Sequence, residues 1–166
     1  GATWQGLATT TAATDAAWPG SRLVVASVNV AYALQPSTAT AARLMHSTDA
    51  GLTWQVVQPS LPRQPGGSLS IAVSSSSPAT VFVSTGSKLS QSSDAGRTFV
   101  DVSVLNHVTT SRIDMFAVRS TREVTVATDP GILTTVNGGE SWSGATTLIR
   151  IVITAGRCGD WLAWRR

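Results

Sequence analysis

Three segments of the chain repeat one pattern of polar and aromatic side chains that could bind a metal ion or shape an active-site turn. Residues 47–54 read STDAGLTW, residues 92–99 read SSDAGRTF and residues 135–142 read TVNGGESW. A calcium loop usually offers several acidic oxygens in a short run, whereas each of these segments has one Asx residue. We therefore predict structural turns, with calcium binding as the alternative.

The residue types of the first segment suit a tight hairpin turn. The Asp49 carboxylate can accept hydrogen bonds from backbone N–H groups two or so positions on, in an Asx turn, and Gly51 can adopt a positive φ. Ser47 and Thr53 can tie the turn from its two sides, and Trp54 can bury a large ring where the next strand begins. The same roles are predicted for Ser92, Asp94, Gly96, Thr98 and Phe99, for Thr135, Asn137, Gly139, Ser141 and Trp142, and for a clipped copy made of Gly1, Thr3 and Trp4.

The spacing of the copies indicates a repeat architecture. Their aromatic residues stand at positions 4, 54, 99 and 142, a period close to the roughly 45 residues of a four-stranded propeller blade. Between the turns, apolar and polar residues alternate as in half-buried strands. We expect one all-β propeller domain over residues 1–166, with blade units at about 22–58, 68–103 and 112–146 and partial strands at 1–10 and 147–166.

Each predicted unit contains four short strands, with the repeated turn between the third and the fourth. The predicted strands are 22–27, 30–35, 42–47 and 53–58, then 68–74, 80–85, 88–93 and 98–103, then 114–120, 123–129, 132–136 and 141–145, with residues 76–79 as a turn.

The repeated pattern, S-x-D-x-G-x-[TS]-[WF], resembles the Asp-box, or BNR repeat, of a family of β-propellers. The departures are mild: Phe99, Asn137 and Thr135 replace Trp, Asp and Ser. The family includes sialidases, sortilin-type receptors, xyloglucan-hydrolysing propellers and photosystem II assembly factors. Its box is a structural hairpin at the outer rim of a blade and is generally not the active site, so the resemblance implies a structural role for these residues.

No residue set matches a catalytic pattern. The resemblance to sialidases would imply an arginine triad with a Tyr–Glu pair and an Asp, but the single tyrosine, Tyr32, lies in a predicted strand as a core residue. Neither His46 nor His107 has metal-ligand spacing, and Cys158 is alone. We predict no catalytic, metal-binding or cofactor-binding residues. The remaining acids are interpreted as turn or cap residues: Asp15, Asp101, Asp114, Asp129 and Asp160.

Composition narrows the range of partners. Eleven of the 12 basic residues are arginine and the formal net charge is +3, but no stripe of base-stacking aromatic residues accompanies them, so we expect no nucleic acid. No apolar run reaches the roughly 18 residues of a membrane span. Aromatic and arginine side chains are enriched in binding hot spots, and a partner contact is predicted at Trp18, Trp161, Trp164, Arg165 and Arg166.

Three blades are fewer than the 4–8 of a closed propeller. The chain opens inside a copy of the repeat, and we expect a fragment or processed chain, a ring completed by a protein partner or second copy, or terminal strands that form a small fourth blade. The predicted function is a non-catalytic binding or scaffolding module for protein or glycan contacts, secreted, periplasmic or at the cell surface. The alternatives are a piece of a sialidase- or xyloglucanase-like hydrolase and an accessory or assembly subunit of a membrane complex.

Overall fold

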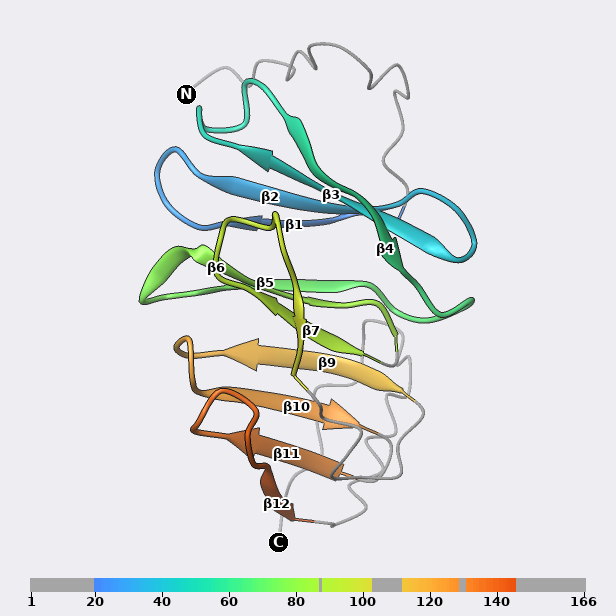
Figure 1. Ribbon diagram of the computed structural model, residues 1–166, viewed down its shortest axis with the longest axis vertical. Helices are drawn as coiled ribbons and strands as arrows, with labels where there is room; N and C mark the ends of the chain where they lie inside the picture. Colours follow the sequence, from blue (N-terminus) through green and yellow to red (C-terminus); the bar gives the residue numbers. More distant parts are fainter. Residues whose placement is uncertain (1–19, 87, 103–111, 129–130, 146–166) are drawn as a thin grey trace, which may run out of the picture.

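Three four-stranded antiparallel sheets make up the part of the chain that the structure describes (Figure 1). The structure is a computed structural model, and it describes residues 20–86, 88–102, 112–128 and 131–145. No helix occurs in these ranges. The sheets follow one another along the long axis of the molecule in the order of the sequence. The predicted all-β propeller-type fold, with blades that do not complete a ring, agrees with this arrangement.

Each sheet contains four strands that are consecutive in the sequence, so each strand pairs with its neighbour in the chain. The first sheet comprises β1 (Arg22–Val25), β2 (Ala31–Pro36), β3 (Ala41–Ser47) and β4 (Gln55–Pro62). The second comprises β5 (Ser70–Ser74), β6 (Ser77–Ser84), β7 (Leu89–Ser92) and β8 (Val100–Asp101). The third comprises β9 (Ile113–Val118), β10 (Val124–Thr128), β11 (Gly131–Thr135) and β12 (Ser143–Ala145).

One predicted turn lies earlier and is shorter than expected. Residues 76–79 were expected to connect two strands, but Ser77, Pro78 and Ala79 begin β6. Ser74 pairs with Ser77, so the connection is only Ser75 and Ser76. A proline is tolerated at the start of a strand, where its missing N–H interrupts no central part of the ladder.

The sheets meet along their first strands. β1 contacts β5, and β5 contacts β9, while β4, β8 and β12 lie at the opposite edges of their sheets. We call β1, β5 and β9 the inner strands. Such a radial arrangement, with one strand of each sheet near a common axis, is that of propeller blades.

The first hydrophobic core lies between the first and second sheets. Tyr32, Leu34 and Leu44 are fully buried there, against Val81 and Val83 of the second sheet. Burying one such side chain contributes about 1.5–3 kcal/mol. Tyr32 also donates a hydrogen bond from its hydroxyl to the Pro78 carbonyl, at 2.9 Å, which ties the two sheets together. The prediction that Tyr32 is a core residue is therefore confirmed.

The second core repeats this arrangement one sheet further along. Phe82 and Leu89 of the second sheet are buried against Ile113, Val124 and Val126 of the third. Successive side chains along β2, β6 and β10 point to opposite faces of their sheets. Apolar side chains therefore lie on both faces of each sheet, as stacked blades require.

Candidate functional site at the repeat turns

The first repeat turn, residues 47–54, is held by a small network around the Asp49 carboxylate. The Ser47 hydroxyl donates to Asp49 Oδ1 at 2.8 Å, and the Thr53 backbone N–H donates to the same oxygen at 2.9 Å. The Thr53 hydroxyl donates to Asp49 Oδ2. Ser47 Oγ also accepts the Gly51 N–H at 2.8 Å. Asp49 thus bonds the backbone four residues on, further than the Asx turn that the sequence suggested.

The second repeat turn, residues 92–99, has the same network with nearly the same distances. The Ser92 hydroxyl donates to Asp94 Oδ1 at 2.8 Å and accepts the Gly96 N–H at 2.8 Å. The Thr98 N–H reaches Asp94 Oδ1 at 2.9 Å, and its hydroxyl reaches Oδ2 at 2.6 Å. The Arg97 N–H adds a further bond to Oδ1 at 3.0 Å.

The third repeat turn, residues 135–142, keeps the geometry without a carboxylate. Asn137 Oδ1 accepts from the Thr135 hydroxyl at 2.9 Å and from the Ser141 N–H at 3.0 Å. Its Nδ2 donates to Ser141 Oγ at 2.8 Å. The Thr135 hydroxyl accepts the Gly139 N–H at 2.9 Å. The third turn has Thr135 in place of Ser and Asn137 in place of Asp. Hydrogen bonds nevertheless join the same positions of the turn as in the first two.

These hydrogen bonds stabilise the ionised form of both aspartates. Donation by the Thr53 side chain, followed by that of the Thr53 backbone, lowers the pKa of Asp49 to about 2. The corresponding donations by Thr98 hold the pKa of Asp94 well below its ordinary value. A general acid needs a pKa near the working pH, so neither carboxyl group is suited to donate a proton at neutral pH.

Two glycines of the repeat turns, Gly96 and Gly139, pack against the sheet before their own. Gly96 has a φ of 88°, and a Cβ on it would overlap Leu44 Cδ2 and come within 3.2 Å of Val57 Cγ2 in the first sheet. A Cβ on Gly139 would likewise overlap Val102 Cγ1. Glycine is thus required by a close contact between sheets as well as by its positive φ.

In each repeat turn, the residue before Gly51, Gly96 or Gly139 makes a contact that the sequence did not predict. The Ala50 N–H donates to the Asn29 carbonyl in the β1–β2 turn at 2.9 Å. The Ala95 N–H donates in the same way to Ala79, and Gly138 to Arg122, each at 2.9 Å. Ala50 and Ala95 have a φ of 60°, a left-handed conformation that is uncommon outside glycine. The bond thus fixes the first and third repeat turns to the first turn of their own sheet, and the second repeat turn to the start of β6.

The aromatic residue that ends each pattern packs differently in the three turns. Trp54 lies just before β4, donates from Nε1 to the Gly51 carbonyl at 3.0 Å, and is buried with Ala31, Ala33 and Met45. Phe99 packs against the core between the first two sheets. Trp142 donates from Nε1 to the carbonyl of Val102 in the preceding sheet at 3.4 Å.

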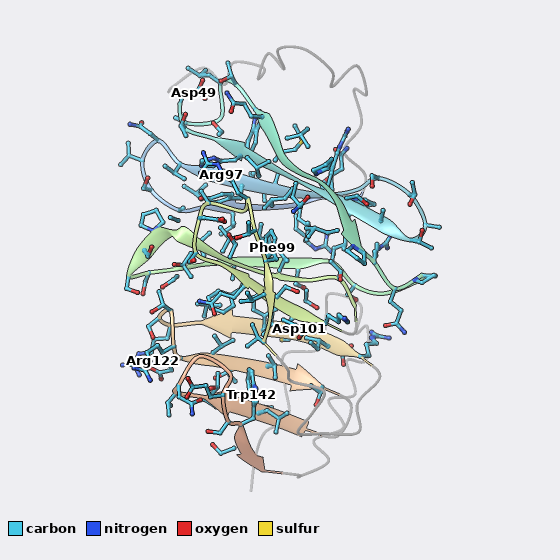
Figure 2. All side chains as sticks on the ribbon, viewed as in Figure 1. Asp49, Arg97, Phe99, Asp101, Arg122 and Trp142 are labelled. Carbon is cyan, nitrogen blue, oxygen red and sulfur yellow. The ribbon has the colours of Figure 1, made fainter. Side chains whose placement is uncertain are left out.

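Arg97 brings a positive charge to the contact between the first two sheets (Figure 2). Its carbonyl accepts from Gln58 Nε2 at 3.4 Å. Burial lowers the pKa of His46, and the Arg97 guanidinium lowers it further. His46 stacks on Tyr32 with ring centroids 4.5 Å apart. The turn of the second sheet therefore reaches over the strands of the first.

Most acidic side chains among the described residues already have partners. Asp101 lies 3.6 Å from Lys88, Asp114 lies 2.6 Å from Arg112, and Glu123 lies 3.1 Å from Arg119. Over the same part of the chain, no group of three or more His, Cys, Asp and Glu residues could hold a metal ion. No helix there is long and apolar enough to cross a membrane.

Several predicted residues lie outside the described ranges. These are the clipped repeat at Gly1, Thr3 and Trp4, the predicted partner contact at Trp18, Trp161, Trp164, Arg165 and Arg166, and Cys158, His107, Asp15, Asp129 and Asp160.

Comparison with solved structures shows the fold. The chain is similar to YCF48 bound to D1 peptide, at 15% identity with a TM-score of 0.55, covering 74% of this chain and 38% of that one. It is also similar to the GH74 xyloglucanase from Xanthomonas campestris, at 15% identity with a TM-score of 0.57, covering 74% of this chain and 22% of that one.

A third similar structure is YCF48 from Cyanidioschyzon merolae, at 17% identity with a TM-score of 0.53, covering 35% of that chain. No family model matches the chain, and the search of curated proteins gives no match. The chain therefore spans well under half of the solved proteins it resembles, and it shares with them the all-β propeller-type fold.

Proposed function

We propose that the chain is a non-catalytic binding or scaffolding module whose repeat turns are Asp-boxes, and that it works outside the cytoplasm through contacts with proteins. The observation that carries this proposal is the state of its carboxylates. Glycoside hydrolysis needs two carboxyl groups facing one bond, one of them able to give a proton near neutral pH. In the described ranges, Asp49 and Asp94 are held ionised by their turns, and three of the other acids are paired with cations.

The surface best suited to a protein partner is the end of the molecule formed by the repeat turns and the first turn of each sheet, which we call the turn end. Arg97 and Arg122 lie along it (Figure 2). The exposed apolar side chains of Val28, Leu52 and Val136 belong to these same turns. Arginine beside apolar side chains is the composition of many protein-binding surfaces.

Arginine side chains also lie at the other end of the described part of the molecule. Arg22 begins β1, Arg43 lies near the start of β3 and Arg63 follows β4, so all three lie at the strand ends away from the first repeat turn. Arg43 donates to the Gln35 side chain at 2.7 Å and Arg63 to the Gly67 carbonyl at 3.2 Å, so these two guanidinium groups are engaged within the fold. Arg22 is exposed there and supplies a matched control for charge at the turn end.

The test is capture of a partner from native membranes, with crosslinking, by the whole chain and by two variants. The double variant Arg97→Glu and Arg122→Glu should lose the crosslinked partner, while Arg22→Glu should retain it. The peptide in the YCF48 structure is a defined second probe for the same three proteins. Capture that survives reversal of both turn-end charges would contradict the proposed surface.

The second candidate function is part of a glycoside hydrolase, because GH74 enzymes are among the similar structures. Turnover of xyloglucan or of a fluorogenic sialoside by the purified chain would overturn the non-catalytic proposal.

The third candidate function, an accessory or assembly subunit of a membrane complex, is a special case of protein binding. It predicts that the crosslinked partner is a membrane-complex subunit. Binding to a glycan without turnover would instead indicate a carbohydrate-binding module.

A further inference from the structure

The two ends of the row of sheets carry the two halves of one contact that the molecule already makes twice. We call the face of each sheet that points toward the next sheet its forward face, and the other its backward face. The forward faces of the first and second sheets are covered by the second and third. Leu44, three residues before the first repeat turn, is 0% exposed, and Leu89, three residues before the second, is 1% exposed.

The forward face of the third sheet has exposed apolar side chains that no other described sheet covers. Ile132 is the residue three positions before the third repeat turn, the place of Leu44 and Leu89, yet it is 47% exposed. In the strand register, Ile132 lies opposite Ala127 of β10, and Ala127 lies opposite Met115 of β9. The Met115 side chain is 65% exposed. Met115, Ala127 and Ile132 therefore form an apolar row across β9, β10 and β11.

A second open site lies on the backward side of β1. In the second sheet, Ile71 and Val73 of the inner strand pack against the core of the sheet before it. In the third, Phe116 and Val118 do the same. The register of strand pairing places Leu23 and Val25 at the corresponding positions of the first sheet, where they are 64% and 68% exposed.

We propose that a second copy of this chain covers both sites, with β1 of one copy lying beside β9 of the other. β5 lies beside β1, and β9 beside β5, in the same way within one chain. Leu23 and Val25 of one copy then pack on Met115 and Ala117 of the other. The contact is made by the inner strands, because Ala31 and Ala33 at the centre of the backward face are already buried.

The number of described sheets favours two copies. A head-to-tail contact produces a closed ring only if its rotation closes. The described residues of one chain form three such sheets, so two copies give six, which is within the 4–8 of closed propellers. Both head-to-tail contacts then form in one dimer, which covers the exposed side chains of Leu23, Val25 and Met115 on the inner strands. This inference rests on the contacts between sheets and not on the proposed partner binding.

The test is sedimentation velocity of the whole chain from micromolar to submillimolar concentration. The wild type should sediment with twice the chain mass. Leu23→Arg and Met115→Arg should each raise the dimer dissociation constant at least about 30-fold, because each buries an unpaired charge in both contacts. Val136→Arg, a matched change at an exposed apolar residue of the turn end, should leave the dimer unchanged.

Mixing the two disruptive variants distinguishes this assembly from others. A mixed dimer has one contact made entirely of wild-type residues, so equimolar Leu23→Arg and Met115→Arg should associate more strongly than either alone. A wild-type chain that stays monomeric at every concentration overturns the proposal, as does a dimer that survives Leu23→Arg. Circular dichroism of each variant separates loss of association from loss of folding, and partner capture is measured independently.

Discussion

Replacing Gly96 with alanine tests whether the repeat turns hold neighbouring sheets together. The φ of 88° at this position lies outside the left-handed region that alanine tolerates, which costs about 1–2 kcal/mol. The new Cβ would also overlap the buried Leu44 side chain, and overpacking of a core costs about 1–3 kcal/mol. We therefore expect the free energy of unfolding to fall by about 2–5 kcal/mol.

The matched control is Gly138→Ala in the third turn. Gly138 has a φ of 78° and no atom within 4 Å of a built Cβ. Its counterparts in the other two turns are Ala50 and Ala95, which both have a φ of 60°. We expect this substitution to cost about 1 kcal/mol or less, because only the backbone conformation opposes it.

The assay is urea unfolding followed by tryptophan fluorescence and far-ultraviolet circular dichroism, with the free energy obtained by linear extrapolation. Both variants carry a cost of positive φ, so a loss of stability in Gly96→Ala that exceeds the loss in Gly138→Ala by more than about 1 kcal/mol reports the contact with Leu44. Equal losses of stability in the two variants would refute the claim that Gly96 is a packing residue between sheets.

Three further predictions concern the same turns. Ser92→Ala should lower the free energy of unfolding by about 1–3 kcal/mol because the buried hydroxyl bonds both Asp94 and Gly96, whereas Ser93→Ala, at the exposed neighbour, should change urea unfolding little. The pKa of Asp49 is lowered from 3.8 to about 2 in the folded protein. The ionised Asp49 carboxylate therefore stabilises the fold above pH 3.8, and this stabilisation is lost as the pH falls through about 2. Urea midpoints measured across that window should therefore vary less in Asp49→Asn than in the wild type, and an unchanged acid dependence would contradict the assignment. Tyr32→Phe should cost about 0.5–1.5 kcal/mol through loss of the bond to the Pro78 carbonyl, measured by the same unfolding assay.

Much of the fold could be predicted because its signals are local. Alternation over a few residues marks each strand, and the hydroxyl, Asx, glycine and aromatic positions mark each repeat turn. The predicted segment 42–47, for example, corresponds to β3 at Ala41–Ser47. The error at residues 76–79 has a local cause as well, because Ser-Pro is usually a turn signal but here Pro78 follows the first residue of β6.

The contacts between sheets could not be predicted from the same signals. Nothing near Gly96 in the sequence reveals that its Cα lies against Leu44, since that contact joins two different sheets. The left-handed conformation of Ala50 is equally hidden, because it is fixed by the N–H bond to Asn29 in another turn. The exposure of Ile132 also depends on what lies beyond the third sheet rather than on its strand.

The third repeat turn helps to decide what the carboxylates of the first two do. In those turns the threonine hydroxyl donates to the second carboxylate oxygen of Asp49 or Asp94. In the third, Asn137 has a donor at that place, and the bond to Ser141 Oγ forms at 2.8 Å with its direction reversed. A hydroxyl can donate or accept, so the turn keeps its shape when the charge is removed. A carboxylate that served a metal ion or a reaction would not be replaced by an amide in this way without loss of its chemistry. The interchange of Asp and Asn within one chain therefore supports a structural role for the repeat turns and directs the search for function to the surfaces around them.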